Sequence, residues 1–241
     1  MTTLPLPRRL LAETVGTALL VTIVVGSGIA ASRLSPDDTG LQLLQNSITT
    51  ALGLAVLILL FGPVSGAHFN PVVTASAWLL DRRQGRDDRL TGRDVVAYTL
   101  AQTTGAVLGA LLANAMFTLP LGQIATTTRT GSGLWLGEIV ATAGLVALIF
   151  ALARSGRGPL SAAAVGAYIG AAYWFTSSTS FANPAVTVGR MFSDTFAGIA
   201  PASVPAFVIA QLIGALLGLG LVVALYPRAI HNSARPVPTG K

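Results

Sequence analysis

Six long apolar stretches fill most of this chain, and they limit its possible folds more than any other feature. A helix needs about 20 apolar residues to cross the hydrocarbon core of a bilayer, and every backbone polar group that crosses must be paired. Six stretches are long enough, at about 10–31, 41–62, 94–118, 133–153, 160–178 and 202–226. The sequence therefore predicts an all-α membrane protein with six transmembrane helices.

Composition agrees with this prediction and excludes several classes of function. Only 10% of the residues are charged, whereas a soluble domain has about 25%. The net charge of +6 does not indicate a nucleic-acid partner, because the basic residues lie between the apolar stretches, as topology signals do. The chain has no cysteine and only two, distant histidines, so we expect no thiolate nucleophile, metal site or other cofactor.

The basic residues also predict an orientation in the membrane. Six spans place both termini on one side, and the side richer in Lys and Arg is normally cytoplasmic. That side would hold Arg8, Arg9, Arg82, Arg83, Arg86, Arg89, Arg93, Arg154, Arg157, Arg228, Arg235 and Lys241, and the other side Arg33, Arg129 and Arg190. We therefore expect a multi-pass protein of the plasma (inner) membrane with both termini cytoplasmic.

The second half of the chain repeats the first. ETVGTALLV from Glu13 matches EIVATAGLV from Glu138, and AQTTGAVLG from Ala101 matches AQLIGALLG from Ala210. Each half has three spans, an odd number, so the copies must face opposite ways across the membrane. Such an inverted 3+3 repeat is expected to have its functional site near the midplane, where the halves meet.

We expect one membrane domain over residues 1–241. Repeat one runs from about 8 to 118 and repeat two from about 133 to 226, followed by a cytoplasmic tail at 227–241. Small residues spaced four apart let membrane helices approach closely. The pairs of this kind are Gly105 with Gly109 and Gly214 with Gly218, and we interpret them as scaffold.

Two Asn-Pro pairs occur at matching places in the repeats, in SGAHFNPVV at 65–73 and STSFANPAV at 178–186. Asn is a good helix N-cap and Pro suits the first helical position. The short apolar pieces that follow, about 71–80 and 184–192, cannot span a bilayer, so we predict two re-entrant half-helices. Inversion would bring their positive N-termini together at the midplane and disfavour cations and protons there.

This geometry predicts the centre of a pore. Each Asn would cap its own helix through the side-chain oxygen and offer its NH2 group to a solute. The preceding loops would run extended and expose carbonyl acceptors. The pore centre would comprise Asn70, Pro71, Val72, Asn183, Pro184 and Ala185, and the carbonyl loops Gly66, Ala67, His68, Thr179, Ser180 and Phe181. Donors at the centre and acceptors leading to it suit neutral hydroxylated molecules.

With these features the chain resembles the major intrinsic protein family, the aquaporins and aquaglyceroporins. The resemblance covers essentially the whole length: six spans, two half-helices, the repeated Glu and AQ-x-x-G elements, and the motif SGAHFNP. It implies an aquaporin-like fold without enzyme activity. It also implies a passive pore in each subunit of a homotetramer embedded in the lipid bilayer.

The chain departs from this family at the outer constriction. Counting from the Asn residues, the four filter positions are Thr50, Ala171, Ser180 and Val186. Family members usually have aromatic residues and an arginine there, so the resemblance implies a wider, uncharged filter that passes larger neutral solutes than water. Val72 also replaces the usual alanine, which adds bulk beside the half-helix junction.

Four ionisable residues leave alternatives open. Arg190 either lines the outer vestibule or pairs with Asp194. Glu13 and Glu138 could carry protons, but we favour a structural role in accepting hydrogen bonds from the irregular loops. His68 either faces the pore or is packed and hydrogen-bonded.

The sequence predicts a passive channel for small uncharged solutes, such as glycerol, urea and undissociated metalloid acids like arsenous acid, with some water. An ordinary glycerol and water pore is the alternative within this class. A coupled secondary transporter is the alternative from another class, because inverted repeats and broken helices occur there too.

Overall fold

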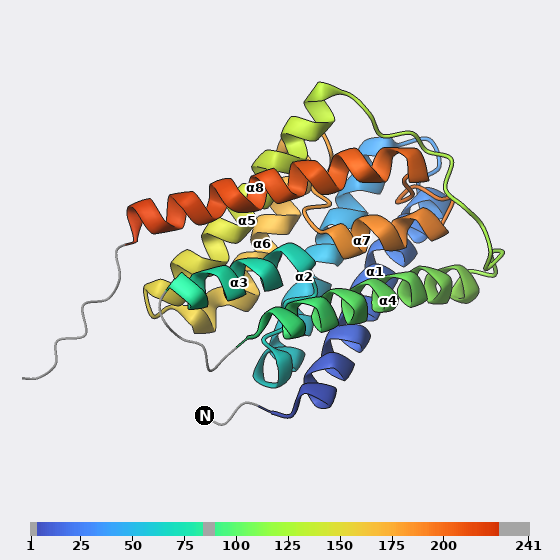
Figure 1. The fold of residues 1–241 in the computed structure, drawn as a ribbon. Helices are drawn as coiled ribbons and strands as arrows, with labels where there is room; N and C mark the ends of the chain where they lie inside the picture. The colour runs from blue at the N-terminus through green and yellow to red at the C-terminus, as the bar shows by residue number, and fades with distance from the viewer. Residues whose placement is uncertain (1–3, 84–89, 227–241) are drawn as a thin grey trace, which may run out of the picture.

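The computed structural model describes residues 4–83 and 90–226, and within them it is all-helical (Figure 1). The α-helices are α1 (Leu6–Leu34), α2 (Thr39–Ser65), α3 (Pro71–Arg83), α4 (Gly92–Met116), α5 (Ser132–Arg154), α6 (Ser161–Phe175), α7 (Pro184–Gly189) and α8 (Val204–Leu225). Short 3-10 turns lie at Gly158–Leu160, Arg190–Phe192 and Pro201–Ser203. The predicted fold class is confirmed, with half-helices α3 and α7 between the longer helices.

Five of the six predicted spans form helices long and apolar enough to cross a membrane. The remaining span is α6, which has 15 residues and is preceded directly by the 3-10 turn Gly158–Leu160. It ends at Phe175 because the polar run that follows starts with Thr176 in an extended conformation. The sequence placed this end at about 178, three residues too late. Because α6 ends at Phe175, residues 176–183 are left to form the loop that leads to α7.

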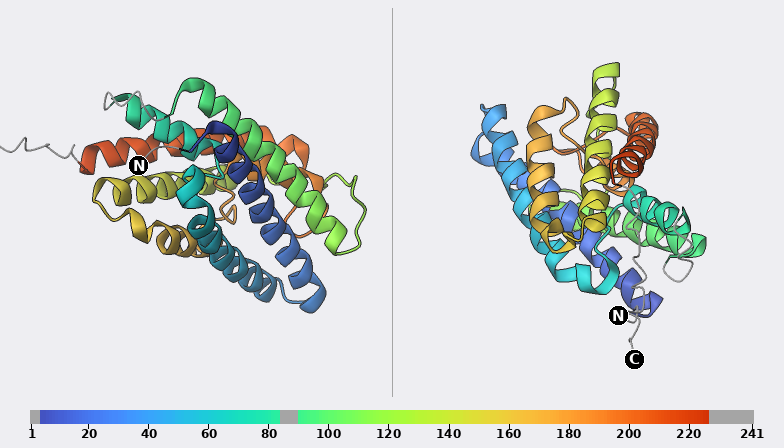
Figure 2. Two further views of the ribbon diagram at one scale, coloured as in Figure 1. Left: turned by 90° about the horizontal axis from the view of Figure 1, so that it is seen from below. Right: turned by 90° about the vertical axis from the view of Figure 1, so that its left-hand side faces the viewer.

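The two halves repeat the same packing. α1 packs most extensively on α4, and α5 packs in the same way on α8, so each pair lies side by side in Figures 1 and 2. Contacts of α1 with α2 and of α2 with α6 then join the pairs into one bundle. A Cβ on Gly109 would lie 2.2 Å from the Ala18 carbonyl oxygen, and one on Gly218 would lie 2.4 Å from that of Ala143. Backbone contact between helices therefore requires these glycines.

The half-helices enter the bundle from the two repeats and meet inside it. α3 contacts α4 and α8, α7 contacts α4 and α8, and the two short helices contact each other. Val72 lies in a buried apolar cluster with Leu80, Val146 and Leu219. Its extra bulk therefore fills a packing site between α3, α5 and α8.

Some sequence predictions fall on residues for which no structure is described. These are the tail 227–241 and the basic residues Arg86, Arg89, Arg228, Arg235 and Lys241, which lie outside the described residues. The boundaries of the two repeats and the cytoplasmic position of the termini remain predictions.

Candidate functional site

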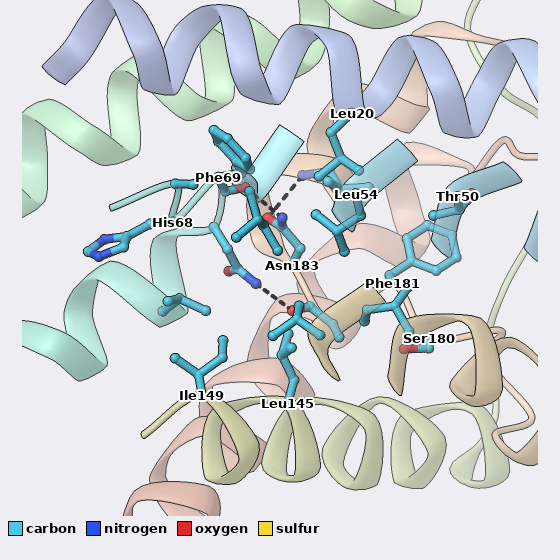
Figure 3. A pocket seen from close by; sticks show the side chains of 18 of the residues that line it. Leu20, Thr50, Leu54, His68, Phe69, Leu145, Ile149, Ser180, Phe181 and Asn183 are labelled. Atoms are coloured by element: carbon cyan, nitrogen blue, oxygen red, sulfur yellow. Dashed lines mark hydrogen bonds between the residues drawn. The ribbon is translucent and has the colours of Figure 1, made fainter. Parts of the chain in front are cut away.

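Asn70 and Asn183 lie at the contact between the two half-helices, and each is bonded to the opposite repeat (Figure 3). Asn70 Nδ2 donates to the Ala182 carbonyl at 2.8 Å, and Asn183 Nδ2 donates to the Phe69 carbonyl at 2.7 Å. Each Oδ1 accepts from the first turn of its own helix, at 3.1 Å from Val72 N and 3.0 Å from Ala185 N. Because an amide has two N–H donors, each Asn keeps one for a solute.

The loops before these asparagines are not extended, which corrects the sequence prediction. Left-handed backbone occurs at Ala67 (φ 49°) and Phe69 (φ 49°) in one loop, and at Thr179, Ser180 and Ala182 in the other. Left-handed residues are rare outside glycine and are maintained only where the surroundings impose them. In each loop the left-handed residues place two backbone amides against a buried carboxylate. These are the amides of His68 and Phe69 in the first loop and of Phe181 and Ala182 in the second.

Those carboxylates are Glu13 and Glu138, both fully buried. Glu13 accepts from His68 N at 3.0 Å and from Phe69 N at 2.7 Å. Glu138 accepts from Phe181 N at 2.8 Å and from Ala182 N at 2.9 Å. Gln102 and Gln211 complete the two arrangements by donating to Glu13 and Glu138. With the amides engaged, the carbonyls of 66–68 and 180–181 accept no bond within the described residues.

One cavity of about 190 Å³ passes both asparagines. Figure 3 shows His68 at one end, Ser180 and Thr50 at the other, and Asn183 between them. The lining residues are Leu20, Val24, Thr50, Leu54, Ile58, Gly66, Ala67, His68, Phe69, Asn70, Val73, Leu145, Ile149, Phe150, Ser161, Val165, Ile169, Tyr173, Ser180, Phe181, Ala182, Asn183, Val186 and Arg190. Polar groups at a few points and apolar side chains elsewhere are typical of a solute path.

The predicted site residues divide into two groups. The cavity lining includes both asparagines, Thr50, Ser180, Val186, Arg190 and most of the carbonyl loops. Pro71, Val72, Pro184, Ala185 and Thr179 do not line it. The prolines begin the half-helices, and Ala185 is buried in the main apolar core.

The structure does not bring Ala171 to the cavity with the other three predicted filter positions. Ala171 is exposed on the outer face of α6, whereas Tyr173 is buried and lines the cavity. Two residues correspond to about 200° around a helix, so a register error of two selects the opposite face. Tyr173 Oη lies 3.2 Å from Thr50 Oγ1, which joins α6 to α2 across this end. Sequence reasoning missed Tyr173, although its spacing of four from Ile169, which also lines the cavity, marks a shared helix face.

Arg190 lines the same cavity as Thr50, Ser180 and Val186, so a positive charge lies beside the predicted filter positions. Its side chain is 3% exposed, donates through Nε to the Ala197 carbonyl, and stacks on Phe181 with Cζ 3.4 Å from the ring centroid. Asp194 has other partners and accepts from the backbone and hydroxyl of Thr126. Of the two interpretations of Arg190, the geometry fits the one in which it faces the solute path.

The two ends of the cavity differ at one pair of symmetric positions. His68 and Phe181 each lie two residues before an Asn, and their rings contact Tyr98 and Phe207 respectively. His68 Nδ1 lies 3.0 Å from Thr74 Oγ1, so this histidine both faces the cavity and is hydrogen-bonded. The repeat therefore supplies a polar ring at one end and an apolar platform for Arg190 at the other.

Replacing Tyr173 with Ala is expected to widen the Arg190 end and to raise the permeability for polyols longer than glycerol, such as erythritol. The matched change Ala171→Leu alters the exposed face and should leave permeability unchanged. Stopped-flow light scattering of proteoliposomes measures both. Increased erythritol flux in Ala171→Leu and none in Tyr173→Ala would restore the original assignment.

Comparison with known proteins agrees with this geometry. The family model described as Major intrinsic protein matches residues 1–181. The chain is 49% identical to the aquaglyceroporin AqpS of Rhizobium meliloti (strain 1021), over 96% of this chain and 94% of that protein. It is 31% identical to the glycerol uptake facilitator protein of Pseudomonas aeruginosa, over 94% of this chain and 91% of that protein.

The fold also matches a solved structure, the X-ray structure of the aquaglyceroporin from Plasmodium falciparum. The TM-score is 0.69 at 18% sequence identity, with 92% of this chain and 97% of that chain covered. On the strength of the family model and of relatives that align along nearly the whole chain, this protein belongs to the major intrinsic protein family.

Proposed function

We propose that this protein is a passive channel for small uncharged solutes, and that glycerol, urea and undissociated metalloid acids such as arsenous acid pass along its cavity together with water. Its membership of the major intrinsic protein family supports a membrane channel for small neutral solutes and not an enzyme. The observation that carries the proposal is the single cavity that passes both asparagines. Each Asn has one N–H free to replace a hydrogen bond that the solute loses when it leaves water.

The lining favours neutral polar solutes. Leu20, Leu54, Leu145 and Ile149 form apolar wall, while the carbonyls of the loops supply acceptors. A solute with hydroxyl or amide groups can bond the polar points and place its carbon skeleton against the apolar side chains. A cation would also meet the positive N-terminal ends of α3 and α7, which disfavour it at the asparagines.

Ion-coupled transport, the alternative from another class, finds little support in this lining. No Asp or Glu is among the residues that line the cavity in the described part of the chain. Glu13 and Glu138 are fully buried and each accepts bonds from two loop amides and a glutamine. A coupling site would need a carboxylate that can exchange its partners during transport.

Stopped-flow light scattering on proteoliposomes tests the proposal. Vesicles containing the protein should equilibrate glycerol, urea and arsenous acid faster than empty vesicles, and at a rate that does not change when proton and sodium gradients are collapsed. Leu54→Trp, which fills the cavity, should reduce the flux toward that of empty vesicles. Leu52→Trp on the same helix is the control, because Leu52 is 65% exposed and faces away from the cavity. Equal fluxes in the two variants, or gradient-dependent uptake, would contradict the proposal.

We also infer a homotetramer in the inner membrane with cytoplasmic termini. The family resemblance and the distribution of basic residues support this arrangement. Crosslinking in native membranes that traps no species larger than a dimer would contradict the tetramer.

A further inference from the structure

The helix α6 packs in different ways on its two neighbours, α2 and α5. Against α2 the backbones touch, because a Cβ on Gly166 would lie 2.5 Å from the Ala51 carbonyl oxygen. Against α5 a single side chain makes the contact, because a Cβ on Gly144 would lie 2.1 Å from Tyr168 Oη. α6 packs extensively on α2 and only sparsely on α5 (Figure 2). The ring of Tyr168 therefore stands between α6 and α5.

Tyr168 is fixed in this position at both ends of its side chain. Its Oη donates to the Ala141 carbonyl of α5 at 3.0 Å. Its ring meets that of Phe175 edge to face, with the centroids 6.1 Å apart. The distance between two packed helices depends on the side chains at their contact. A phenol ring whose hydroxyl is bonded to the opposite backbone therefore acts as a spacer between the helices.

Repeat one has a glycine where repeat two has this tyrosine. Gly53 directly precedes Leu54, and Tyr168 directly precedes Ile169; Leu54 and Ile169 both line the cavity. A Cβ on Gly53 would lie 2.7 Å from the Ile23 side chain of α1, so α2 approaches α1 closely there. α1 and α2 accordingly pack extensively, whereas α5 and the shorter α6 do not.

The spacer lies beside the wall of the cavity and not in it. Tyr168 does not line the cavity, but the residue after it, Ile169, does. On the opposite helix, Gly144 is followed by Leu145, which also lines the cavity. Figure 3 shows Leu145 directed from α5 toward the region of Asn183. The separation of α5 and α6 therefore sets how far this apolar wall stands from the asparagines.

We propose that Tyr168 is a positioning residue that sets the width of the lumen at the asparagines, and with it the largest solute that passes. With the ring in place, the wall leaves room for the carbon skeleton of a polyol such as glycerol. Without the ring, α6 closes on α5, and the narrowed lumen passes water in preference to glycerol. This inference rests on the proposed channel function and names a residue that sets its size limit.

Four variants test the spacer: Tyr168→Ala, Tyr168→Phe, the double variant Tyr168→Ala/Gly144→Leu, and Trp135→Ala. Phenylalanine keeps the ring and removes only the hydroxyl. Leucine at 144 refills the space from α5, as Ile23 does from α1 against Gly53. Trp135→Ala is the control for loss of an aromatic ring, because Trp135 is on α5 but does not line the cavity. Stopped-flow light scattering of proteoliposomes measures glycerol and water fluxes, and gel filtration in detergent checks folding.

Tyr168→Ala should lower the ratio of glycerol flux to water flux by about tenfold, the lower end of the discrimination that one methylene group produces in a shaped pocket. Tyr168→Phe should keep the ratio of the unmodified protein and unfold at a lower temperature, because it loses the bond to the Ala141 carbonyl. The double variant should recover the ratio, and Trp135→Ala should not change it. If Tyr168→Ala does not fold, Tyr168→Leu decides, because its shorter side chain should give an intermediate ratio.

The outcomes separate the two proposals. An unmodified protein that conducts glycerol no faster than empty vesicles overturns the channel function. The spacer is overturned, and the channel function left standing, by a conducting protein whose ratio is unchanged in Tyr168→Ala, falls equally in Tyr168→Phe or Trp135→Ala, or fails to recover in a folded double variant.

Discussion

Replacing Glu138 with Leu is expected to abolish solute flux and to destabilise the folded protein severely. The change removes the acceptor for Phe181 N, Ala182 N and the Gln211 side chain, all buried. Each unpaired buried donor costs about 1–3 kcal/mol, so three of them approach the net stability of a typical domain, about 5–15 kcal/mol. Without the carboxylate, the left-handed backbone at Ala182 loses the hydrogen bonds that fix the loop directly before Asn183.

Thermal unfolding in detergent, together with the glycerol flux of any protein that reconstitutes, measures this effect. Glu13→Leu should behave in the same way, because Glu13 has the equivalent partners in repeat one. Asp38→Ala is the control acid. It removes an exposed cap at the start of α2, which costs about 1 kcal/mol, and should leave flux intact. A Glu138→Leu protein with normal flux would show that the loop keeps its shape without the carboxylate.

Gly218→Ala is expected to give the largest loss of stability of any single-methyl change in α8. The added Cβ would lie 2.4 Å from the Ala143 carbonyl oxygen, and a backbone atom cannot move aside as the end of a side chain can. α8 and α5 would have to separate along their whole contact. We expect a loss of about 3 kcal/mol, at the upper end of the range for overpacked cores.

Gly220→Ala is the matched control for this prediction. It lies two residues further along α8, where an added Cβ meets nothing within 4 Å. Alanine is the better helix former, so this variant should unfold at the same or a higher temperature. Equal thermal midpoints for the two variants would mean that close contact between α5 and α8 does not limit stability.

Sequence reasoning located the features that depend on local chemistry. Asn-Pro pairs predicted the starts of α3 and α7, because capping and the fixed φ of proline act within a few residues. The apolar stretches predicted the spans, because the length and composition of one contiguous segment decide whether it can cross a bilayer. The internal repeat then predicted that the two half-helices would meet, since inversion is a property of the whole chain.

The features that sequence reasoning missed depend on how a helix is rotated about its axis and on contacts between residues that are distant in the sequence. Whether Ala171 or Tyr173 faces the cavity depends on how α6 is rotated against α2, and counting back from Asn183 does not fix that rotation. Arg190 lines the cavity with its guanidinium packed on the Phe181 ring, and a contact of this kind is not visible in the sequence. The left-handed loops depend on Glu13 and Glu138, which lie more than 40 residues away.

The crossed bonds of Asn70 and Asn183 have a consequence for biosynthesis. Each asparagine needs a carbonyl from the other repeat, so a nascent chain that ends after α4 has a donor without its acceptor. The lumen comes into existence only when the second half of the chain has been inserted beside the first. A chain that ends after α4 lacks the part of the cavity wall that Leu145, Val165 and Asn183 supply, so it cannot form the same cavity.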